Sequence, residues 1–406
     1  MGKTRFGQLR FDKTKEEMVA EYCKLWEPVR ATETVPLREA EGRVMPREVF
    51  SLYDLPVVRS SRMDGICVKS EMFADGLPDT AGWKMGEEYM RADTGDDFDD
   101  AYDTVIAIED VTLADGGVTL DPELKFTPGM NVAPRGSMLK KDAPLARALV
   151  PLRALDLAAL AMGGYGEVEV YRRPRVAFIP TGSELVPAGA ELRRGQNFDS
   201  NSILVERTLL SIGAEPVCYP IVRDSLETLR ETLRGALADS DVVLINGGSA
   251  KGGEDFNARL LHEEGEVYTH GVPAGPGRPM CLAVIGGKPV INVPGPSLGT
   301  FFALQWCVSR VVERFLNIPA RENPRITGIL SEELRCPPHF DFIVRMNVRR
   351  TESGYVLYPA GRGSASSAEV SSADAMFVSV KGESLYPKGS ELTVEMLRDT
   401  GFLVTE

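Results

Sequence analysis

The sequence predicts an α/β plus β multidomain fold. It would have a central, doubly wound α/β domain, a helical linker, a small β domain and a C-terminal β domain. Three observations lead to this prediction. At roughly 150 residues per domain, 406 residues suggest two to four domains. Apolar strands alternate with helices between residues 172 and 320, which is typical of a parallel sheet. On both sides of that region, short β-rich runs lie between Gly, Pro and Asp turns.

The helical linker domain is expected to combine residues 1–50 with residues 137–171. Residues 14–50 fit two helices separated by a turn. The first spans Glu16–Trp26 and ends before Pro28, with apolar residues at helical spacing; these are Met18, Val19, Tyr22 and Leu25. A further helix is expected over Leu152–Met162, closed by Gly163-Gly164.

Two β domains are expected, at residues 51–136 and 321–406. Both contain short runs of β-forming residues bounded by turn residues. In the first domain the runs are Ile66–Val68, Thr104–Ile108 and Gly117–Leu120. In the second they are Phe342–Val348, Tyr355–Tyr358, Ala375–Val380 and Leu392–Met396.

The α/β domain is expected at residues 172–320. Its predicted strands are Arg175–Ile179, Glu215–Val222, Asp241–Ile245 and Lys288–Val293. One helix would be capped by Asp199-Ser200-Asn201, run through Ile212 and stop at Gly213. Another would follow Asp224 and bury one face of leucines; these are Leu226, Leu229, Leu233 and Leu237.

Charge and composition argue against several classes of partner. The chain has 46 basic and 59 acidic residues, a net charge of −13, which disfavours nucleic acid and anionic membranes. It has no apolar run of the roughly 18 residues needed to cross a membrane, and no signal peptide is visible. Its six cysteines form no C-x-x-C pair, and three dispersed histidines do not suggest a metal cluster. A cytoplasmic protein is therefore expected.

Three predicted strands end in turns of small residues: Thr181–Glu184, Asn246–Ser249 and Pro294–Ser297. Open α/β sheets bind ligands beyond the carboxyl ends of their strands. Glycine lets a ligand approach the backbone, and exposed N–H groups favour anions. A phosphate or a pterin-like ligand would fit such an edge. The alternative is that the turns only connect elements, and none matches a P-loop or a dinucleotide motif.

Two acidic residues stand beside glycine turns. Glu184 follows Gly182-Ser183 where a helix could begin, so it could hold a divalent cation, act as a base, or complement a helix dipole. Asp64 precedes Gly65 and is locally a turn residue. The acidic run Asp96–Asp103 lacks the spacing of a calcium loop and fits a solvated loop better.

Several segments resemble the molybdopterin molybdenumtransferase family, which includes MoeA and the gephyrin E-domain. Residues 61–65 (S-R-M-D-G) resemble its N-S-A-M-D-G segment, and Gly129–Gly136 resembles G-x-N-V-R-x-x-G. Thr94-Gly95, Asp103–Val105 and Glu109-Asp110 resemble T-G…A-D-A-V…E-D. Arg172–Leu185 is similar to R-R-P-R-V-A-x-x-S-T-G-D-E-L, and residues 195–201 to G-Q-I-Y-D-S-N. The matches run in order from about residue 14 to 400.

The resemblance implies an elongated four-domain protein, typically a homodimer, with a MogA-like domain that binds molybdopterin. Family members insert molybdate into adenylylated molybdopterin and release AMP, in a cleft shared with the partner subunit. A molybdoenzyme or a cofactor-biosynthesis protein would be a further partner. Asp64 and Glu184 match acidic site residues and would hold Mg²⁺, and Arg278 would hold the oxyanion. The implied pterin-binding positions are Thr181, Gly182, Ser183, Asp199, Ser200, Asn201, Gly247, Gly248, Ser249, Gly252, Asp255, Pro276, Gly277, Pro294, Gly295, Ser297, Arg362 and Ser364.

This chain also departs from the family motifs. G-E-D-[IL] becomes Gly136–Leu139, so Met138 replaces an acid, and K-P-G-K-P becomes Gly275–Pro279, so Gly275 and Arg278 replace lysines. L-P-G-N-P-V-S becomes Val293–Gly299, which loses its Asn and shifts its Ser, and S-G-G-V-S-V-G-D becomes Asn246–Gly253. These departures leave open a non-catalytic carrier or scaffold that binds cofactor, or a related reaction on another nucleotide-like substrate. The metal could be molybdenum or tungsten.

Overall fold

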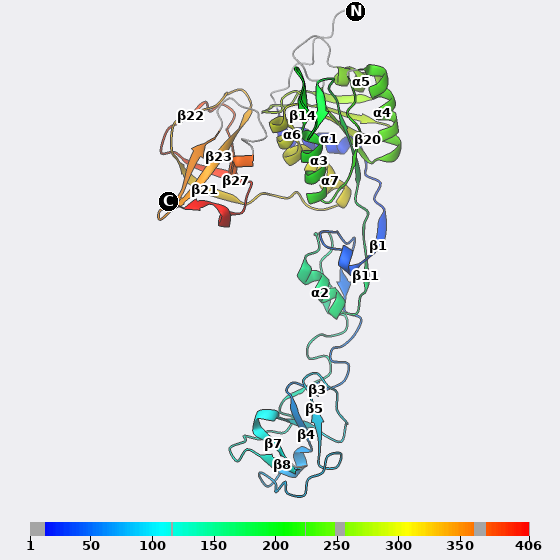
Figure 1. Ribbon diagram of the computed structural model, residues 1–406, viewed down its shortest axis with the longest axis vertical. Coiled ribbons are helices and arrows are strands. Elements are labelled where there is room, and N and C mark those ends of the chain that lie inside the picture. The colour runs from blue at the N-terminus through cyan, green and yellow to red at the C-terminus, as the bar shows by residue number, and fades with distance from the viewer. Residues whose placement is uncertain (1–12, 115–116, 224, 248–255, 361–370, 406) are drawn as a thin grey trace, which may run out of the picture. The chain divides into compact units, whose positions relative to one another are not determined.

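The computed structural model describes residues 13–114, 117–223, 225–247, 256–360 and 371–405 (Figure 1). The chain forms two compact units, Glu33–Val170 and the combination of Met1–Thr32 with Tyr171–Glu406. Each unit is described by itself. The two units are a coarser division than the four expected domains, whose boundaries stay a prediction.

A six-stranded sheet forms the centre of the 171–406 unit. Its order is β15-β12-β16-β20-β19-β17. The four predicted strands are parallel, which confirms the expected doubly wound α/β region, and β19 and β17 add two antiparallel strands at one edge. The reason is local: Gly286-Gly287, with φ of 57° and 77°, makes a two-residue hairpin between β19 and β20. The strands are β12 (Arg175–Pro180), β15 (Glu215–Cys218), β16 (Val242–Asn246), β17 (Glu266–His270), β19 (Cys281–Ile285) and β20 (Lys288–Val293).

Helices cover both faces of this sheet (Figure 1). On one face, Leu229 and Leu233 of α4 and Leu260 of α5 are buried against alternate residues of β12 and β16. Ser225 Oγ caps α4 by accepting from Thr228 N; the expected cap, Asp224, lies outside the described residues. The helices are α3 (Asn201–Ser211), α4 (Leu226–Asp239), α5 (Phe256–Glu264), α6 (Ser297–Ala303) and α7 (Ser309–Leu316), with a π-helical turn η5 (Leu304–Val308) between the last two.

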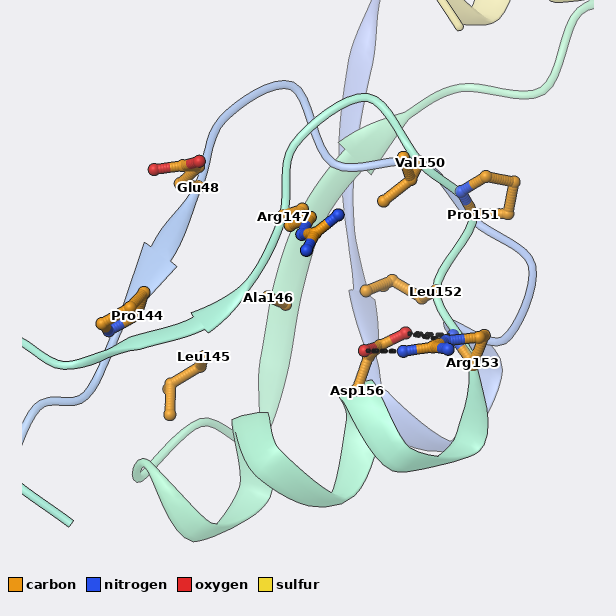
Figure 2. Close-up of a pocket in the computed structure, with 10 residues that line it drawn as sticks. All are labelled: Glu48, Pro144, Leu145, Ala146, Arg147, Val150, Pro151, Leu152, Arg153 and Asp156. Carbon is orange, nitrogen blue, oxygen red and sulfur yellow. Dashed lines mark hydrogen bonds and ion pairs between the residues drawn. The ribbon is translucent and has the colours of Figure 1, made fainter. Parts of the chain in front are cut away.

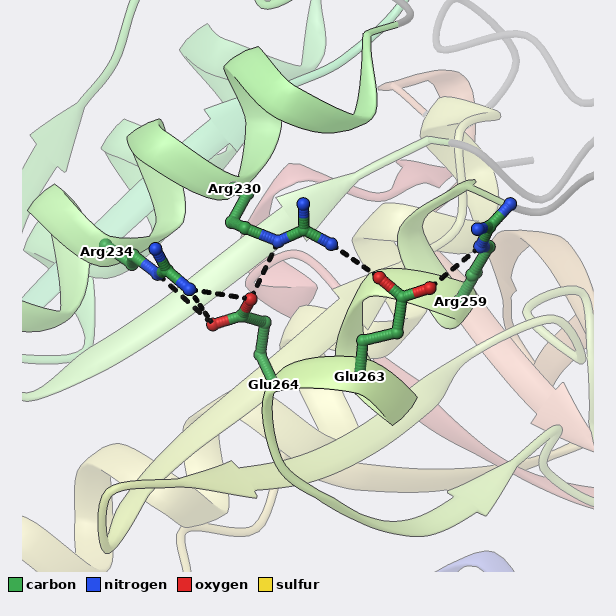
Figure 3. A network of polar contacts seen from close by, with 5 residues as sticks. All are labelled: Arg230, Arg234, Arg259, Glu263 and Glu264. Carbon is green, nitrogen blue, oxygen red and sulfur yellow. Dashed lines mark hydrogen bonds and ion pairs between the residues drawn. The ribbon is translucent and has the colours of Figure 1, made fainter.

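An ion-pair network joins α4 to α5 (Figure 3). Arg230 donates to Glu264 at 2.7 Å and to Glu263 at 2.5 Å, and Arg234 also contacts Glu264. Arg259 donates to Glu263 from one turn earlier on α5. Such partly exposed pairs add little stability one by one, but a network fixes geometry better than an isolated pair. The network therefore orients α5 against α4.

Helix α1 (Lys15–Tyr22) begins with a capping box between Thr14 and Glu17. It packs on the six-stranded sheet, since the buried Tyr22 hydroxyl donates to Ala283 O at 2.8 Å. The division into two units accordingly groups Met1–Thr32 with Tyr171–Glu406. The chain then tightens into a 3₁₀ turn, η1 (Cys23–Leu25), which moves Leu25 off the buried face and leaves it 52% exposed.

The linker part of the 33–170 unit has strands where a second helix was expected. Pro36 and Pro46 lack the backbone donor that a helix interior needs, so the segment is largely extended. Val35, Met45, Leu152, Leu160 and Val170 form its core. The elements are β1 (Thr32–Pro36), η2 (Leu37–Glu39), β2 (Val49–Phe50), β10 (Pro144–Ala146), α2 (Ala154–Met162) and β11 (Glu167–Tyr171); β1 pairs β11 and β2 pairs β10.

The small β part confirms the β-rich expectation. Gly65 in the central strand β4 admits no side chain, because a Cβ there would lie 1.9 Å from Ile106 O. The elements are β3 (Ser60–Ser61), β4 (Gly65–Val68), η3 (Ser70–Phe73), β5 (Tyr89–Ala92), β6 (Thr104–Ala107), η4 (Ile108–Asp110), β7 (Val111–Ala114), β8 (Gly117–Leu120) and β9 (Val132–Ala133). Strands β5-β4-β6 form one sheet, and β7-β8 and β3-β9 form pairs.

The C-terminal β region is a closed sheet, since β23 pairs with both β24 and β25 around the order β23-β24-β21-β27-β25. It meets the α/β region through β18 (Ala274–Gly275), which pairs with the start of β23. Ile343 and Met376 also pack on Leu298 and Phe302 of α6. The strands are β21 (Arg325–Leu330), β22 (Leu334–Arg335), β23 (Asp341–Thr351), β24 (Gly354–Pro359), β25 (Ala375–Val378), β26 (Leu385–Tyr386), β27 (Glu391–Met396) and β28 (Val404–Thr405), with η6 (Thr400–Phe402).

Candidate functional site

The ends of three neighbouring parallel strands form the candidate site. Pro180 of β12 is level with Asn246 of β16, and Asn246 is level with Val293 of β20. The turns that follow therefore lie side by side: Thr181 N donates to Asn246 O at 2.9 Å, and Gly247 N donates to Val293 O at 3.3 Å. The expectation that these turns share one edge is confirmed.

The backbone is tightly packed along this edge. Gly247 has a φ of 107°, and a Cβ there would lie 2.8 Å from Thr181 O. A Cβ on Gly299 would lie 2.8 Å from Pro294 Cβ and 3.6 Å from Gly277 Cα, so the Pro276-Gly277 turn joins the same edge. Side chains are excluded at these contacts, which leaves a surface of backbone for a ligand to approach.

A network of buried amides holds the turns together. Asn246 Nδ2 donates to Pro294 O at 2.6 Å and to Thr300 Oγ1 at 3.2 Å, and Thr300 Oγ1 donates to Pro294 O at 2.5 Å. Asn201 Nδ2 donates to Asn246 Oδ1 at 2.9 Å and to Gly295 O at 2.7 Å. Asn257 Nδ2 donates to Gly247 O at 2.9 Å. The backbone carbonyls of Gly247, Pro294 and Gly295 thus each find a donor.

Among these amides, sequence reasoning assigned a binding role only to Asn201 and named Asn246 only as the first residue of a turn. The signal was present, because Asn246 ends an apolar strand and Asn292 interrupts another, where a buried polar side chain requires partners. Asn201 is itself 6% exposed, and its Oδ1 has no hydrogen-bond donor among the described residues. That oxygen is buried within the amide network.

The Asp199–Asn201 segment places its side chains in different roles. Asp199 is buried, and its carboxylate accepts from Ser202 N at 3.0 Å and from Ser202 Oγ at 2.5 Å, so it caps α3. Ser200 Oγ lies 3.0 Å from Ser297 Oγ, which joins the start of α3 to the start of α6. The Ser200 and Ser297 hydroxyls therefore lie at the edge of the sheet. The Asp199 carboxylate instead accepts hydrogen bonds from Ser202 at the start of α3.

Glu184 is exposed but does not begin a helix, so that expectation was wrong. It precedes β13 (Leu185–Pro187), which pairs with β14 (Asn197–Asp199), and Glu184 O accepts from Asn197 N at 2.9 Å. No helix dipole acts on the carboxylate there. The side chain bends back toward its own turn, since a Cβ on Gly182 would lie 2.8 Å from Glu184 Oε2.

Asp64 belongs to the 33–170 unit. Its exposed carboxylate oxygen Oδ1 accepts from both Thr94 Oγ1 and Thr94 N at 2.7 Å. The hydrogen bond from the Thr94 side chain, followed by that from the Thr94 backbone, lowers the pKa of Asp64 below its ordinary value. The sequence motif T-G at residues 94–95 thus has a direct structural role beside Asp64.

The remaining expected positions fall into two groups. Arg278 is exposed and its guanidinium lies over the ring of Phe340, a residue that sequence reasoning had missed. Met138, which replaces a family acid, is 67% exposed in the 33–170 unit. Six expected site residues lie outside the described residues: Gly248, Ser249, Gly252, Asp255, Arg362 and Ser364.

Two cavities in the linker part of the 33–170 unit are lined by none of the expected site residues. The larger, of about 570 Å³, is lined by Glu48 and residues from 144 to 156 (Figure 2). Its Arg153 and Asp156 pair with each other at the start of α2. Within the described ranges, no group of three or more His, Cys, Asp and Glu side chains could hold a metal ion, and no helix could cross a membrane.

Two family models match the chain in succession. The MoeA N-terminal region (domain I and II) matches residues 11–164, and the probable molybdopterin binding domain matches residues 177–314, which contains the strand-end turns. A structure titled as a molybdopterin biosynthesis MoeA protein from Pyrococcus horikoshii covers 95% of this chain and all of its own, at 25% identity and a TM-score of 0.78. The chain belongs to the MoeA family.

Relatives of this MoeA-family chain extend over most of its length. The molybdopterin molybdenumtransferase of Nostoc sp. is 27% identical over 90% of this chain and 89% of its own. That of Haemophilus influenzae is 26% identical over 79% of this chain and 78% of its own. The resemblance inferred from the sequence motifs is therefore confirmed.

The buried amide network should be essential to the stability of this MoeA-family fold. Replacing Asn246 by Ala removes the hydrogen bond that it donates to Pro294 O and the one that it accepts from Asn201 Nδ2, which should lower the free energy of unfolding by about 2 kcal/mol. Denaturant unfolding measures this. Asn197→Ala, at an exposed position, is the control and should change stability by less than about 0.5 kcal/mol. Equal effects of the two substitutions would contradict the network.

The hydrogen bonds from Thr94 should control the titration of Asp64. Thr94→Val removes the hydroxyl donor, so the pKa of Asp64 should rise toward its ordinary value, as followed by carboxyl-carbon NMR. Because this pKa is lowered in the folded state, the contact stabilises the fold above the unfolded-state pKa, and this contribution is lost as the pH falls through the folded-state pKa. Thr112→Val is the control. An unchanged Asp64 pKa in Thr94→Val would contradict this assignment.

Proposed function

We propose that this chain is a molybdopterin molybdenumtransferase that inserts molybdate, or tungstate, into adenylylated molybdopterin and releases AMP. The observation that carries the proposal is the strand-end site within the region that matches a molybdopterin-binding domain. Relatives named for this activity align over most of both chains, which supports catalysis. The alternative of a non-catalytic carrier is not favoured.

The pterin phosphate would bind at the glycine turns after β12, β16 and β20. Backbone atoms at Gly182, Gly247 and Gly295 can approach an anion without a side chain between them. The Ser200 and Ser297 hydroxyls can donate to a phosphate oxygen at the same edge, and Asn201 supports the turn from inside by donating to Gly295 O. Ser183, Gly248, Ser249, Gly252, Asp255, Arg362 and Ser364 complete the proposed contacts.

Asp64 and Glu184 would hold Mg²⁺. Both are exposed carboxylates, which are the ligands that Mg²⁺ prefers, and the ion is commonly held by one or two carboxylates together with substrate phosphates. When bound, Mg²⁺ supplies positive charge at the phosphoanhydride. Thr94 donates two hydrogen bonds to Asp64 Oδ1, which fixes the orientation of the exposed carboxylate.

Arg278 would hold the molybdate oxyanion. Its planar guanidinium can donate two parallel hydrogen bonds to oxygens of one anion. It follows Gly277, whose backbone lies beside Gly299, and Arg278 O accepts from Val272 N at 2.9 Å. A homodimer, a cytoplasmic location and delivery of the product to a molybdoenzyme or a cofactor-biosynthesis partner are parts of the same proposal.

The direct test is AMP release from adenylylated molybdopterin by the purified protein in magnesium. We expect release that depends on added molybdate, because insertion and AMP release are one reaction. Liquid chromatography of the nucleotide products measures it, and a reaction without molybdate is the control. Tight binding of the nucleotide without AMP release would instead identify a carrier.

Glu184 should be needed for catalysis and not for folding, since its side chain is exposed. Glu184→Gln should remove most AMP release, because a neutral amide is a poor ligand for Mg²⁺, while leaving the thermal unfolding midpoint within a few degrees of the wild type. Glu191→Gln, in the exposed loop before β14, is the matched control and should keep full activity. Unchanged AMP release in Glu184→Gln would exclude the role.

A further inference from the structure

The exposed guanidinium of Arg278 rests on an aromatic ring from the C-terminal β region. Its Cζ lies 5.0 Å from the centre of the Phe340 ring, within the range of a cation–π contact. The contact is built into the fold, because β18 pairs in parallel with β23, with Ala274 level with Asp341 and Gly275 level with Phe342. Residues that are more than sixty positions apart thus come together where the two regions join.

The same ring explains a second feature of this segment. A Cβ atom at Gly275 would lie 2.6 Å from Phe340 Cε2 and 3.4 Å from Phe342 Cδ2. The first distance is shorter than real Cβ contacts allow, so a residue with a side chain would displace the Phe340 ring. The family motif K-P-G-K-P has lysine at this position, and that lysine is incompatible with the ring as it lies here.

The other lysine of that motif is replaced by Arg278. A guanidinium is flat and weakly hydrated, so it stacks on an aromatic face better than the compact ammonium of lysine. Stacking covers one face and leaves the N–H groups in the plane available for an oxyanion. The Phe340 ring therefore accounts for both differences from the family motif: it leaves no room for a side chain at position 275, and it favours arginine over lysine at position 278.

Phe340 is itself held in place. Its ring meets Phe342 at 6.3 Å between centres and an interplanar angle of 60°, an edge-on arrangement that aromatic pairs favour. Phe342 N donates to Ser379 Oγ at 3.0 Å, which fixes the start of β23 against the strand beside it. Gly277, the residue before Arg278, packs against Gly299, so the backbone next to the arginine is also held in place.

We propose that Phe340 is a positioning residue that orients the Arg278 guanidinium to bind a tetrahedral oxyanion, and that Gly275, Arg278 and Phe340 act together in place of the two family lysines. The inference rests on the proposed function in that the oxyanion is molybdate or tungstate. The ring does not touch the anion; it acts by limiting the orientations of the arginine, so that less freedom is lost on binding.

A double-mutant cycle tests the coupling, with sodium molybdate as the probe and its dissociation constant measured by calorimetry on the full chain. Arg278→Ala should raise the dissociation constant at least about tenfold, as expected for lost charged hydrogen bonds. Phe340→Leu should raise it about two- to fivefold, and Phe340→Tyr, which keeps the ring, should not. In the Arg278→Ala background, Phe340→Leu should have no further effect.

A matched control exists in the same β region, where Arg349 lies over Tyr358 at 4.8 Å. Tyr358→Leu removes an equivalent stack and should leave molybdate binding unchanged. A merely structural role of Phe340 would make its effect persist in the Arg278→Ala background, which would overturn the proposal. Failure of the wild type to bind molybdate would also overturn it.

The outcomes for this proposal and for the proposed function are separable. Molybdate binding that follows the expected cycle, without AMP release from the nucleotide substrate, would support the positioning role and contradict the transferase. AMP release that survives Phe340→Leu with an unchanged KM for molybdate would contradict the positioning role alone. A raised KM with an unchanged kcat is the expected kinetic result, because the ring acts on anion binding.

Discussion

The buried side chain of Asn246 is the constraint on which the candidate site depends. It ends the central strand β16, donates to Pro294 after β20, and accepts from Asn201 on α3. Where parallel strands end, their last carbonyl groups lose the partners that a neighbouring strand provides. Asn246, Asn201 and Asn257 supply donors to these carbonyls, so the chain can leave the sheet in tight turns without burying unpaired polar groups.

The hydrogen bonds of Asn246 help to explain two positions at which the chain differs from the family motifs. Asn246 stands where the family motif has serine, and Pro296 stands where it has asparagine. An amide at the end of β16 reaches across to the Pro294 carbonyl, and Thr300 reaches the same carbonyl from α6. The turn after β20 is therefore held from inside the protein. The positions that differ from the family motif, Asn246 and Pro296, therefore lie in a hydrogen-bonded turn.

The second organising feature is the junction between the α/β and C-terminal β regions. Pairing of β18 with β23 brings Phe340 under Arg278, and a hydrophobic cluster of Leu298, Phe302, Ile343 and Met376 closes the same junction. On the N-terminal side, the buried Lys15 contacts Asp341 at 3.2 Å, so α1 is tied to the first residue of β23. The segment that carries Arg278 is thus supported by both regions.

The sequence by itself determined the alternation of strands and helices between residues 172 and 320, the three strand-end turns and the two β regions. These follow from local periodicity and from turn residues, which act over a few positions. It could also have predicted the β19–β20 hairpin from Gly286-Gly287. Tertiary structure alone decided the packing of α1 on the sheet, the amide network around Asn246, and the contacts of Thr94 with Asp64 and of Phe340 with Arg278. Those contacts join residues from 30 to more than 200 positions apart, and only the packing of whole elements brings such side chains within hydrogen-bonding or stacking distance.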